Sequence, residues 1–380
     1  MSGLIKRFLV VVNAVLAAVL ALSYLAPHVS PETLWPLAFL GLVFPIFVVA
    51  NLVLVLFWIS QKKWYFIISL VILLIGIKPI SRTYQLSGID AREQTKEGDP
   101  GESGAADPGT AESGAGDLKI LSYNVRVFGL VGNARYGPEQ DSIFSLIRRE
   151  NPDVVCFQEF YVNSNKGLTL EKVESQLPGM PYHHVIWLTQ GNNSKYGIAT
   201  FSKYPMVKKG RVVLERTYNA SIYSDLLIDK KRVRIFNNHL QSIRFNRRDY
   251  QFITNQNQYN DSDKLRALQD ISFRLRDAFI KRSRQAKEIS GHIRRSSFPV
   301  LVCGDFNDTP VSYTYQTIRR RLKDAFVEAG SGMGITYKGR FPSFRIDYVF
   351  YDPSFQIRGF DVVQRQLSDH YPITAAFRIP

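Results

Sequence analysis

Cysteine is scarce in this 380-residue sequence, and no segment repeats at a fixed period. The absence of a period excludes a solenoid or another repeat architecture. The two cysteines, Cys156 and Cys303, each stand in an apolar run just before a polar motif. We interpret both as small buried apolar residues rather than nucleophiles. A disulfide between them is the alternative if this part of the chain lies outside the cytosol.

Charged residues are rare over residues 1–87, which are dominated by Leu, Val, Ile, Phe and Ala. Three apolar runs lie there, at 8–25, at 34–59, and at 64–77 with Pro79 and Ile80. The first two reach the roughly 20 residues that cross a bilayer, and the third is marginal. A cleaved signal peptide would explain only the first run. Residues 1–87 therefore predict a membrane anchor of about three transmembrane helices.

Basic residues beside these runs predict the orientation of the anchor. Lys6 and Arg7 precede the first run and Lys62 and Lys63 precede the third, whereas residues 27–33 contain no Lys or Arg. Positive charge marks cytoplasmic segments. With three spans, the C-terminal domain would lie on the non-cytoplasmic side of an inner or plasma membrane. The basic residues after the third run favour the opposite side, and so would a third run that does not cross.

Apolar bulk is missing from residues 88–117, which are rich in Gly, Pro, Ser and acidic side chains. Such a segment cannot bury enough surface to fold, so it predicts a disordered, flexible linker. The linker separates the anchor from a third region at 118–380.

Acidic residues are under-represented in this third region. It contains 40 of the 48 Lys and Arg residues but only 24 of the 33 Asp and Glu residues. The positive surplus favours anionic partners such as nucleic acid, acidic lipid head groups or phosphorylated small molecules. Charge that serves solubility alone is the alternative.

Residues 118–380 alternate short apolar runs with longer amphipathic stretches. The apolar runs predict strands at 118–124, 154–158, 182–188, 197–202, 207–214, 221–228, 232–240, 300–303, 345–351 and 373–378. The amphipathic stretches predict helices at 140–150, 169–177, 263–294 and 312–321. The close spacing of strands between 182 and 240 favours sheet-on-sheet packing flanked by helices.

One predicted strand ends in a particularly polar loop. The buried run at 299–302 breaks at Gly304 into Asp305, Asn307 and Asp308. Carboxylates and amides held on a rigid strand end suit a hard metal ion or the positioning of a water nucleophile. A turn that caps the following helix is the structural alternative for this loop.

Other predicted strands also end in, or begin with, polar side chains: Asn124, Glu159, His239, Asp347 and the pair Asp369-His370. Taken singly, several have an ordinary structural interpretation, such as a turn cap for Asn124 or a hydrogen-bonded core histidine for His239. An Asp inside an apolar strand, as at Asp347, is costly to bury without a partner. Because these groups recur at one strand end after another, they predict a shared site.

These motifs, in this order, resemble the endonuclease/exonuclease/phosphatase superfamily. The matching motifs are Ser-Tyr-Asn124, Gln-Glu159, Asn-His239-Leu, Gly-Asp305-Phe-Asn307, Arg-Ile-Asp347-Tyr and Ser-Asp369-His370. Members of the superfamily include deoxyribonucleases, abasic-site endonucleases, neutral sphingomyelinases and inositol polyphosphate 5-phosphatases. The resemblance covers residues 118–380. It implies a four-layered α/β sandwich, in which two mixed sheets pack face to face and helices lie outside.

The resemblance also implies a divalent cation, Mg²⁺ with Mn²⁺ as the alternative. Glu159 resembles the principal ligand, with Asn124 near the same ion and Asp369 as a further contributor. Mg²⁺ prefers oxygen ligands and keeps several waters, so one or two carboxylates suffice. Abasic-site endonucleases have an acidic residue two positions after the amide, where this chain has Arg126. This difference puts a second metal ligand in doubt.

The catalytic roles follow from the same resemblance. His370 corresponds to the general base or the electrostatic partner of the scissile phosphate, and Asp347 would orient it. Asp305 corresponds to the group that aligns or deprotonates the attacking water. Asn307 would donate to a phosphate oxygen, and His239 would contact the phosphate or the leaving oxygen. Candidates for substrate contact or support of the site are Tyr123, Asn219 and Asp225.

The sequence therefore predicts a membrane-anchored, metal-dependent hydrolase of phosphoester bonds. A nuclease is favoured by the basic segments at 244–248 and 281–284, which could follow a phosphate backbone. The alternatives are a solvated helix face for the second segment, and a phospholipid phosphodiesterase or small-molecule phosphatase of the same fold. A tethered binding module without activity is a third class, which the complete set of acidic, amide and histidine groups disfavours.

Overall fold

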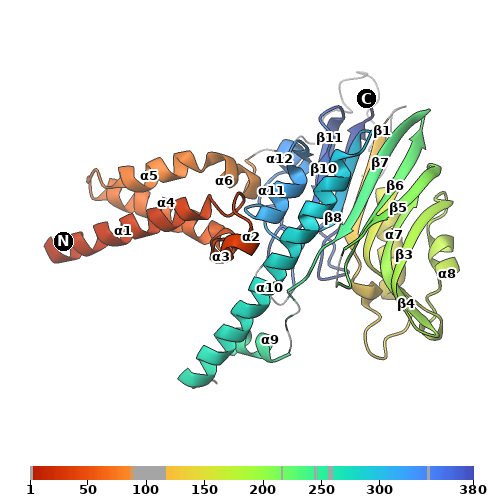
Figure 1. Cartoon of the computed structure of the whole chain (residues 1–380), viewed down its shortest axis with the longest axis horizontal. Coiled ribbons are helices and arrows are strands. Elements are labelled where there is room, and N and C mark those ends of the chain that lie inside the picture. The colour runs from red at the N-terminus through yellow and green to blue at the C-terminus, as the bar shows by residue number, and fades with distance from the viewer. Residues whose placement is uncertain are drawn as a thin grey trace, which may run out of the picture. The chain divides into compact units, whose positions relative to one another are not determined.

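The computed structural model describes residues 3–86, 88, 117–214, 217–243, 245, 247–255, 260–339 and 343–380 (Figure 1). The predicted linker lies outside the described residues, apart from its two end positions. The chain divides into two units. The first unit contains residues 1–84, 242–287 and 308–318, and the second contains 85–241, 288–307 and 319–380. Every predicted site residue belongs to the second unit.

The first sheet of the second unit has the strand order β11-β12-β1-β2-β4-β3. Its strands are β1 (Asp117–Asn124), β2 (Val154–Asn163), β3 (Tyr182–Gln190), β4 (Ser194–Ser202), β11 (Gln356–Val362) and β12 (Ile373–Arg378). Only the β1/β2 pair is parallel; its register aligns Asn124 with Gln158. The carboxyl end of β1 therefore lies beside the middle of β2, next to Glu159.

The second sheet has the order β5-β6-β7-β8-β10-β9. Its strands are β5 (Met206–Val212), β6 (Ala220–Ile228), β7 (Lys231–His239), β8 (Val300–Asp305), β9 (Lys323–Asp324) and β10 (Asp347–Tyr351). Here β7 and β8 are the parallel pair, and their register places His239 beside Asp305. The antiparallel partner β10 places Asp347 on the other side of Asp305. Three predicted site residues thus share one row across the sheet.

The inner faces of the two sheets share one apolar core. Ile120 and Cys156 enter it from the first sheet, and Ile235, Leu301 and Cys303 enter it from the second. Both cysteines are fully buried free thiols, which agrees with their interpretation as small apolar residues.

Helices cover the two outer faces (Figure 1). Phe144 of α7 (Pro138–Glu150) and Val173 of α8 (Leu170–Gln176) pack in a second core with Phe157 of the first sheet. Against the second sheet, His292 in the last turn of α10 (Asp261–Arg294) contacts the ring of Tyr223. The order helix, sheet, sheet, helix confirms the predicted four-layered α/β sandwich.

Most predicted elements are present, but several boundaries differ and some elements are additional. Strand β2 continues beyond the predicted end at 158, because a bulge between Phe157 and Phe160 lets it pair again with β4. Strand β11 was not predicted, since its partly exposed residues lack a regular apolar alternation. The other additional elements are β9, α9 (Arg247–Thr254) and α12 (Ala325–Ala329).

The first unit contains the apolar helices α1 (Gly3–Ser23), α3 (Pro36–Leu42), α4 (Phe44–Ser60), α5 (Phe66–Ile75) and α6 (Ile77–Thr83), together with the short α2 (Pro31–Leu34) and α11 (Tyr313–Arg319). By length and composition α1 could cross a membrane. The described residues hold up to three such spans if the bent pairs α3/α4 (63°) and α5/α6 (71°) each count as one. The first bend has a local cause, since Pro45 lacks the amide donor that would continue the helix.

Three polar side chains lie inside this helical unit, as do apolar ones such as Trp58, and many large apolar side chains lie on its surface. Ser69 lies within hydrogen-bond distance of the amide oxygens of Asn13 (2.5 Å) and Asn51 (2.8 Å), and all three side chains are fully buried. Phe8 and Leu56, by contrast, are 66% and 61% exposed. So large an exposed apolar surface is unusual for a helical bundle in water.

Candidate active site

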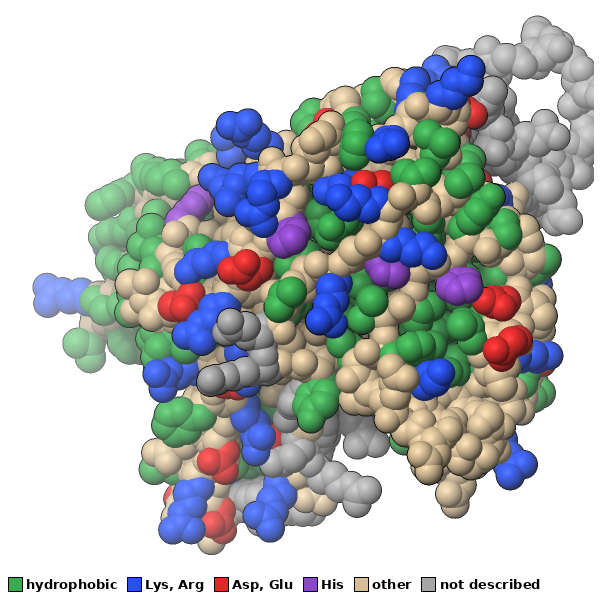
Figure 2. Space-filling model, turned by 45° about the vertical axis from the view of Figure 1, so that its right-hand side comes forward, with side chains coloured by type: hydrophobic (Ala, Val, Ile, Leu, Met, Phe, Trp, Pro, Cys, Tyr) green, Lys and Arg blue, Asp and Glu red, His purple; other side chains and the backbone are tan. Residues whose placement is uncertain are grey.

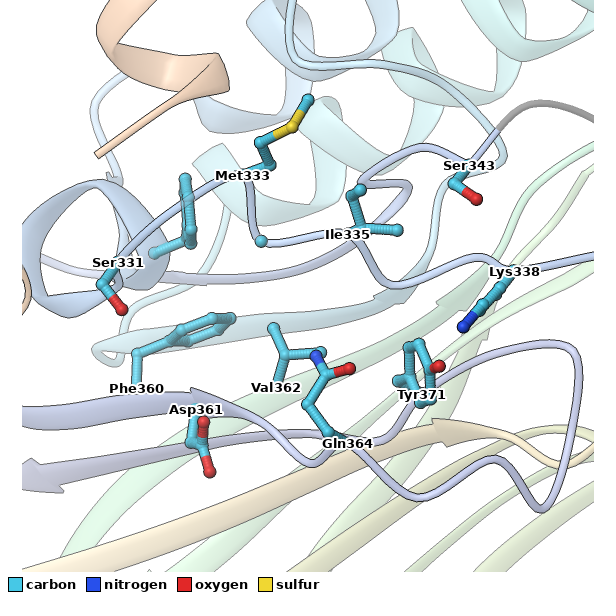
Figure 3. Close-up of a pocket in the computed structure, with 12 residues that line it drawn as sticks. Ser331, Met333, Ile335, Lys338, Ser343, Phe360, Asp361, Val362, Gln364 and Tyr371 are labelled. Atoms are coloured by element: carbon cyan, nitrogen blue, oxygen red, sulfur yellow. The ribbon is translucent and has the colours of Figure 1, made fainter. Parts of the chain in front are cut away.

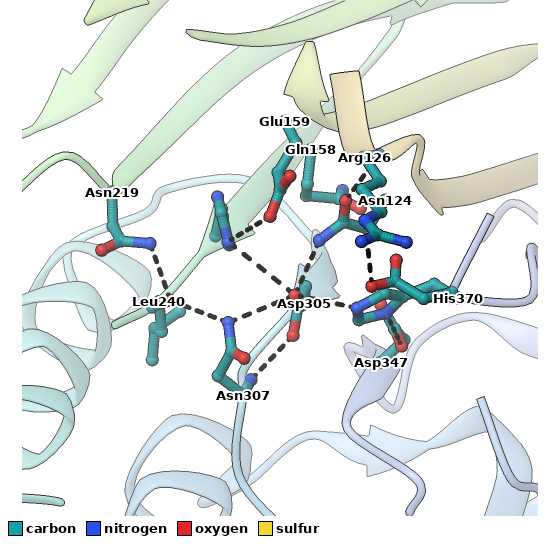
Figure 4. Close-up of polar contacts among 12 residues, drawn as sticks. Asn124, Arg126, Gln158, Glu159, Asn219, Leu240, Asp305, Asn307, Asp347 and His370 are labelled. Atoms are coloured by element: carbon teal, nitrogen blue, oxygen red, sulfur yellow. Dashed lines mark hydrogen bonds and ion pairs between the residues drawn. The ribbon is translucent and has the colours of Figure 1, made fainter. Parts of the chain in front are cut away.

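The candidate active site lies at the carboxyl ends of β1, β7 and β8, at the bulge within β2 and at the start of β10 (Figure 4). Gly304 allows the strands to approach closely there. Its φ is +131°, and a Cβ atom at this position would lie 2.0 Å from the carbonyl oxygen of Asn238 on β7. Any side chain would therefore separate β7 from β8. The glycine in the Gly-Asp-Phe-Asn motif thus brings Asp305 close to His239.

Asp305 is the centre of the hydrogen-bond network in Figure 4. Its Oδ2 accepts from the side-chain amides of Asn124 (2.9 Å) and Asn307 (3.2 Å), and its Oδ1 accepts from the backbone amide of Asn307 (2.8 Å). Burial raises the pKa of Asp305 to about 6; the nearby His370 acts against this shift and Asp347 adds to it. A carboxylate with a pKa near neutrality can orient a water molecule and accept a proton from it.

His370 is held between two carboxylates. Its Nδ1 lies 2.9 Å from Oδ2 of Asp347, and its Nε2 lies 3.7 Å from Oδ2 of Asp305. Burial acts to lower the pKa of His370, but Asp347 and Asp305 outweigh burial and raise it to about 10. The ring is therefore a proton donor at neutral pH, with its orientation fixed through Nδ1.

A second histidine lies on the opposite side of Asp305. Nε2 of His239 is 3.8 Å from Oδ2 of Asp305 and 3.9 Å from Oε1 of Glu159. Both distances exceed a hydrogen bond but allow a common small ligand or water between the groups. The two histidines thus approach the same carboxylate from two sides.

Glu159 reaches the site because of an unusual backbone conformation. Its φ is +51°, within the bulge of β2, and its carboxylate is 29% exposed near His239. Burial raises the pKa of Glu159, while His370, the amide of Asn124 and Arg126 lower it. A carboxylate that is desolvated in this way would be stabilised by a cation.

Arg126 and Asp369 form the rim of the site. Nε of Arg126 lies 3.4 Å from Oδ2 of Asp369, and the guanidinium side chain is 57% exposed. The backbone amide of Arg126 donates to Oδ1 of Asn124 at 3.0 Å. Three successive residues, Arg126, Val127 and Phe128, have φ values between +44° and +55°. Such conformations are strained for residues with a Cβ atom, and they are common at functional sites.

Most of the predicted site residues converge in this arrangement. Those brought together are Asn124, Glu159, His239, Asp305, Asn307, Asp347 and His370, with Asp369 at the rim. Asn219 joins them indirectly, because its amide donates to the carbonyl oxygen of Leu240 (2.8 Å), which also accepts from Asn307 (3.0 Å).

Two predicted candidates are not part of the hydrogen-bond network around Asp305. Asp225 forms a two-point ion pair with Arg234, at 2.5 and 2.8 Å, within the β6/β7 ladder. Tyr123 is fully buried among the apolar side chains that include Phe157. Neither residue makes a hydrogen bond to the cluster around Asp305 among the contacts that the described residues show.

Sequence analysis did not identify several supporting residues. Gln158 and Asn237 are joined by a hydrogen bond of 2.7 Å between the two sheets, beneath the site. Thr336 accepts from the backbone amide of Asp347 (3.1 Å), and the ring of Tyr337 contacts that of His370 at 5.1 Å. Gln158 and Asn237 stand next to predicted motifs, which was a usable signal. Thr336 and Tyr337 come from a loop that no sequence pattern connects with the site.

A recess of about 530 Å³ lies beside the site (Figure 3). Lys338 and Tyr371 stand at one end of it, and Phe360, Asp361 and Val362 line its floor along β11. Tyr371 directly follows His370, and the backbone amide of Lys338 donates to the carbonyl oxygen of Asp369 at 2.8 Å. The recess therefore begins one residue from the histidine and combines apolar side chains with polar ones and a cation.

The family model of the endonuclease/exonuclease/phosphatase family matches residues 121–370, which contain all of these groups. The chain belongs to this family. Residues 6–83 match the model of a domain of unknown function, DUF8431. The search of curated proteins finds no match.

Solved structures with the family's fold are similar to the chain at low identity. The human Nocturnin catalytic domain is 18% identical, covering 69% of this chain and 94% of its own, with a TM-score of 0.49. A family member from Bacteroides vulgatus is 17% identical, with coverages of 70% and 99% and a TM-score of 0.49. A mannosyl-6-phosphatase from Bacteroides thetaiotaomicron is 15% identical, with coverages of 68% and 99% and a TM-score of 0.48.

The donor groups of this family member fit a hard divalent cation. Asp305, Asp347 and His370 offer ligand atoms that all lie within 4.8 Å of one another. In this group, however, Asp347 and His370 already share a hydrogen bond. Glu159 offers a carboxylate that is mostly buried but still reachable from solvent. Asn124 and Asp369 add oxygen atoms nearby. Because Mg²⁺ prefers such oxygen ligands, the second set fits it better.

Proposed function

We propose that the chain is a membrane-anchored, Mg²⁺-dependent phosphoesterase that hydrolyses phosphodiester bonds by attack of water. The observation that carries this proposal is the position of Asp305, whose Oδ2 lies 3.7 Å from His370 and 3.8 Å from His239. One carboxylate with two histidines beside it can position water and phosphate in the same small space.

In this mechanism the acid and histidine side chains around Asp305 have separate roles. Asp305 orients the attacking water and takes its proton. Nε2 of His370 donates to a phosphate oxygen, while Asp347 holds the ring through Nδ1. His239 contacts the phosphate or the leaving oxygen from the side of Glu159. These contacts place charge opposite the oxygens that become more negative in the transition state.

Asn307 supports this arrangement. Its side chain donates to Asp305 and to the carbonyl oxygen of Leu240, so the amide is fixed at the edge of the site. When a phosphate is bound, this amide would exchange one of its two acceptors for a phosphate oxygen. Mg²⁺, or Mn²⁺ in its place, would be held by Glu159 with Asn124 and Asp369. When bound, the cation neutralises charge on the phosphate and helps to align it.

A nucleic acid is the first candidate substrate. The chain has a net charge of +15, and Figure 2 shows Lys and Arg side chains spread over one face among fewer acidic ones. Positive charge of this kind attracts a phosphate backbone. A phospholipid is the second candidate, favoured by the exposed apolar side chains of the first unit, such as Leu56. The recess at Lys338 would hold the organic group of a smaller ester.

The anchor is the second part of this proposal. We assign three spans, to α1, to α3 with α4, and to α5 with α6, and we place the catalytic unit on the non-cytoplasmic side. The buried polar cluster of Asn13, Asn51 and Ser69 and the exposed apolar exterior support this assignment. Protease added to spheroplasts would degrade the catalytic unit. Complete protection would contradict the assigned side.

Activity is tested with the full chain in nanodiscs, with Mg²⁺ or with EDTA, on plasmid DNA, phospholipid vesicles and bis-p-nitrophenyl phosphate. We expect Mg²⁺-dependent hydrolysis of at least one substrate and its loss in His370→Ala. The matched control is His183→Ala, because His183 lies on β3 and contacts Glu174 rather than the site. Activity that withstands both EDTA and His370→Ala would refute the proposal, as would the absence of activity on all three substrates.

A further inference from the structure

The first half of α10 carries an apolar stripe that changes from buried to exposed along the helix. Leu265, Leu268, Leu275 and Phe279 recur at intervals of three, seven and four residues, which places them on one face. Leu275 and Phe279 are only 5% and 2% exposed, whereas Leu265 and Leu268 are 59% and 54% exposed. The exposed leucines therefore continue an apolar surface whose other end is already covered.

The covered end of the stripe packs against the loop region between α1 and α4. The ring of Phe279 meets that of Phe39 on α3 at 5.4 Å, and Phe39 meets Trp35 at 5.5 Å. The guanidinium group of Arg276 lies 5.8 Å above the ring of Trp35. All of these residues belong to the first unit, so α10 is attached where the chain passes from the first apolar helix to the second.

An ion-pair cluster strengthens this attachment. Glu32 on α2 accepts from Nε of Arg284 at 2.9 Å and from Nζ of Lys287 at 2.7 Å. Two cations thus bind one carboxylate on α2. In Figure 1 the first turns of α10 extend beyond α2 and α3 and lie below them. The exposed leucines are at this end of the helix.

The polar residues of α10 are arranged for a surface with one apolar side. Asp263, Asp270 and Asp277 recur every seven residues, opposite the stripe, whereas Asp261 at the start of the helix lies in line with it and pairs with Lys264 at 3.6 Å. Lys264 and Arg276 flank the stripe itself. A mainly polar face opposite an apolar stripe, with basic residues at the boundary, is typical of helices that lie in a membrane interface.

We propose that the first half of α10 lies in the lipid interface, with Leu265 and Leu268 inserted at the boundary between head groups and acyl chains. This inference rests on the proposed membrane anchor. The lipid surface is favoured over a second copy of the chain for two reasons. The exposed stripe spans little more than one helical turn, which is short for a helical dimer. It also continues directly from the contact with α2 and α3.

This inference gives α10 a function beyond covering a sheet. The helix begins in the interface and ends against the second sheet of the catalytic unit, near Tyr223. It is one continuous helix of 34 residues. The catalytic unit would therefore have a second attachment to the bilayer, separate from the linker.

The test uses the full chain in phosphatidylcholine nanodiscs with one added cysteine that carries an environment-sensitive fluorophore. Native Cys156 and Cys303 are fully buried and do not compete for the label in the folded chain. The three variants are Leu268→Cys on the stripe, Asp270→Cys on the opposite face of the same helix, and Leu56→Cys on α4. Doxyl-labelled lipid then serves as the quencher.

We expect the label at Leu268→Cys to emit at shorter wavelength than that at Asp270→Cys, and to be quenched at least about twofold more, since interfacial helices insert ~5–10 Å into the acyl boundary. The label at Leu56→Cys should be quenched as well. Equal weak quenching at both α10 positions, with strong quenching at Leu56→Cys, would overturn the inference and leave the anchor intact. A blue-shifted but unquenched label at Leu268→Cys would indicate a protein contact and would also overturn it. Weak quenching at all three positions would reject the anchor and, with it, this inference.

Discussion

Asp347 and His370 form the shortest link in the candidate active site between an acid and a histidine, with Oδ2 and Nδ1 2.9 Å apart. The other ring nitrogen faces Asp305 at 3.7 Å. A carboxylate on Nδ1 fixes both the tautomer and the orientation of the ring. Asp347 therefore acts on the reaction through His370 and is a positioning residue.

Asp347→Asn should lower kcat/KM by about 10²-fold, within the range that a positioned acid–base group supplies. The fall should appear in kcat, because the ring is misplaced in the transition state while substrate binding is largely kept. Steady-state kinetics measures this fall on whichever of the three test substrates the unaltered chain hydrolyses. Asp347→Glu should recover part of the activity. The control is Asp352→Asn, just after the same strand, where the acid only caps an exposed turn with Ser354. An unchanged kcat in Asp347→Asn would contradict the assigned role.

Glu159→Gln should weaken Mg²⁺ binding. The change removes the carboxylate charge and keeps the size of the side chain, so the Mg²⁺ concentration for half-maximal activity should rise about 10- to 100-fold, as for other weakened metal sites. A second readout is independent of activity: Mg²⁺ should raise the unfolding temperature of the unaltered chain more than that of the variant. Glu150→Gln is the control, because Glu150 pairs with Lys119 at the other end of β1. If Mg²⁺ raises both unfolding temperatures equally, the ion binds elsewhere.

Asp225→Asn should reduce stability and leave kcat/KM within about twofold. The sequence made Asp225 a candidate for substrate contact or support of the site, but Asp225 is 1% exposed and bound twice by Arg234. Removing one partner of a buried ion pair costs about 3 kcal/mol, because the other charge stays buried. Chemical denaturation and kinetics on the same preparation separate the two effects. A large loss of kcat/KM at unchanged stability would mean that Asp225 acts in the active site.

Asp225 also shows where sequence reasoning reached its limit. The strand-end residues Asn124, His239 and Asp305 could be predicted because a strand of known direction places its end at a defined edge of the sheet. Asp225 lies in the middle of β6, where only the register decides its partner. Register depends on contacts between distant segments, which one sequence does not display.

The same limit applies to the backbone and to the helices. Glu159 was predicted as a ligand, but its turn to φ +51° comes from a bulge that the pattern Phe-Gln-Glu-Phe does not reveal. The helix at 263–294 was predicted nearly in full. Its apolar stripe could be read from spacing alone, but the burial of Phe279 and the exposure of Leu268 depend on packing with α3. Local periodicity therefore identified elements, and tertiary contacts decided their roles.

His184 should make the stability of the chain depend on pH. The side chain is buried on β3, with Nδ1 3.0 Å from the hydroxyl of Ser224. Burial, with Lys209 and His183 adding to it, lowers the pKa of His184 from 6.5 to about 4. Between these two values the unfolded chain binds a proton that the folded chain does not. The contribution of neutral His184 to the free energy of unfolding is therefore present in full above pH 6.5, and it is lost as the pH falls towards 4.

The variant His184→Gln removes this titration. The unfolding temperature of the unaltered chain in nanodiscs should fall between pH 7.5 and pH 5. That of the variant should fall less over the same interval. His183→Gln is the control, since this neighbouring histidine is 34% exposed and contacts Glu174. Its unfolding temperature should fall with pH as in the unaltered chain. Equal falls in all three proteins would mean that His184 is not the group responsible, because only a proton taken up preferentially by the unfolded chain produces the slope.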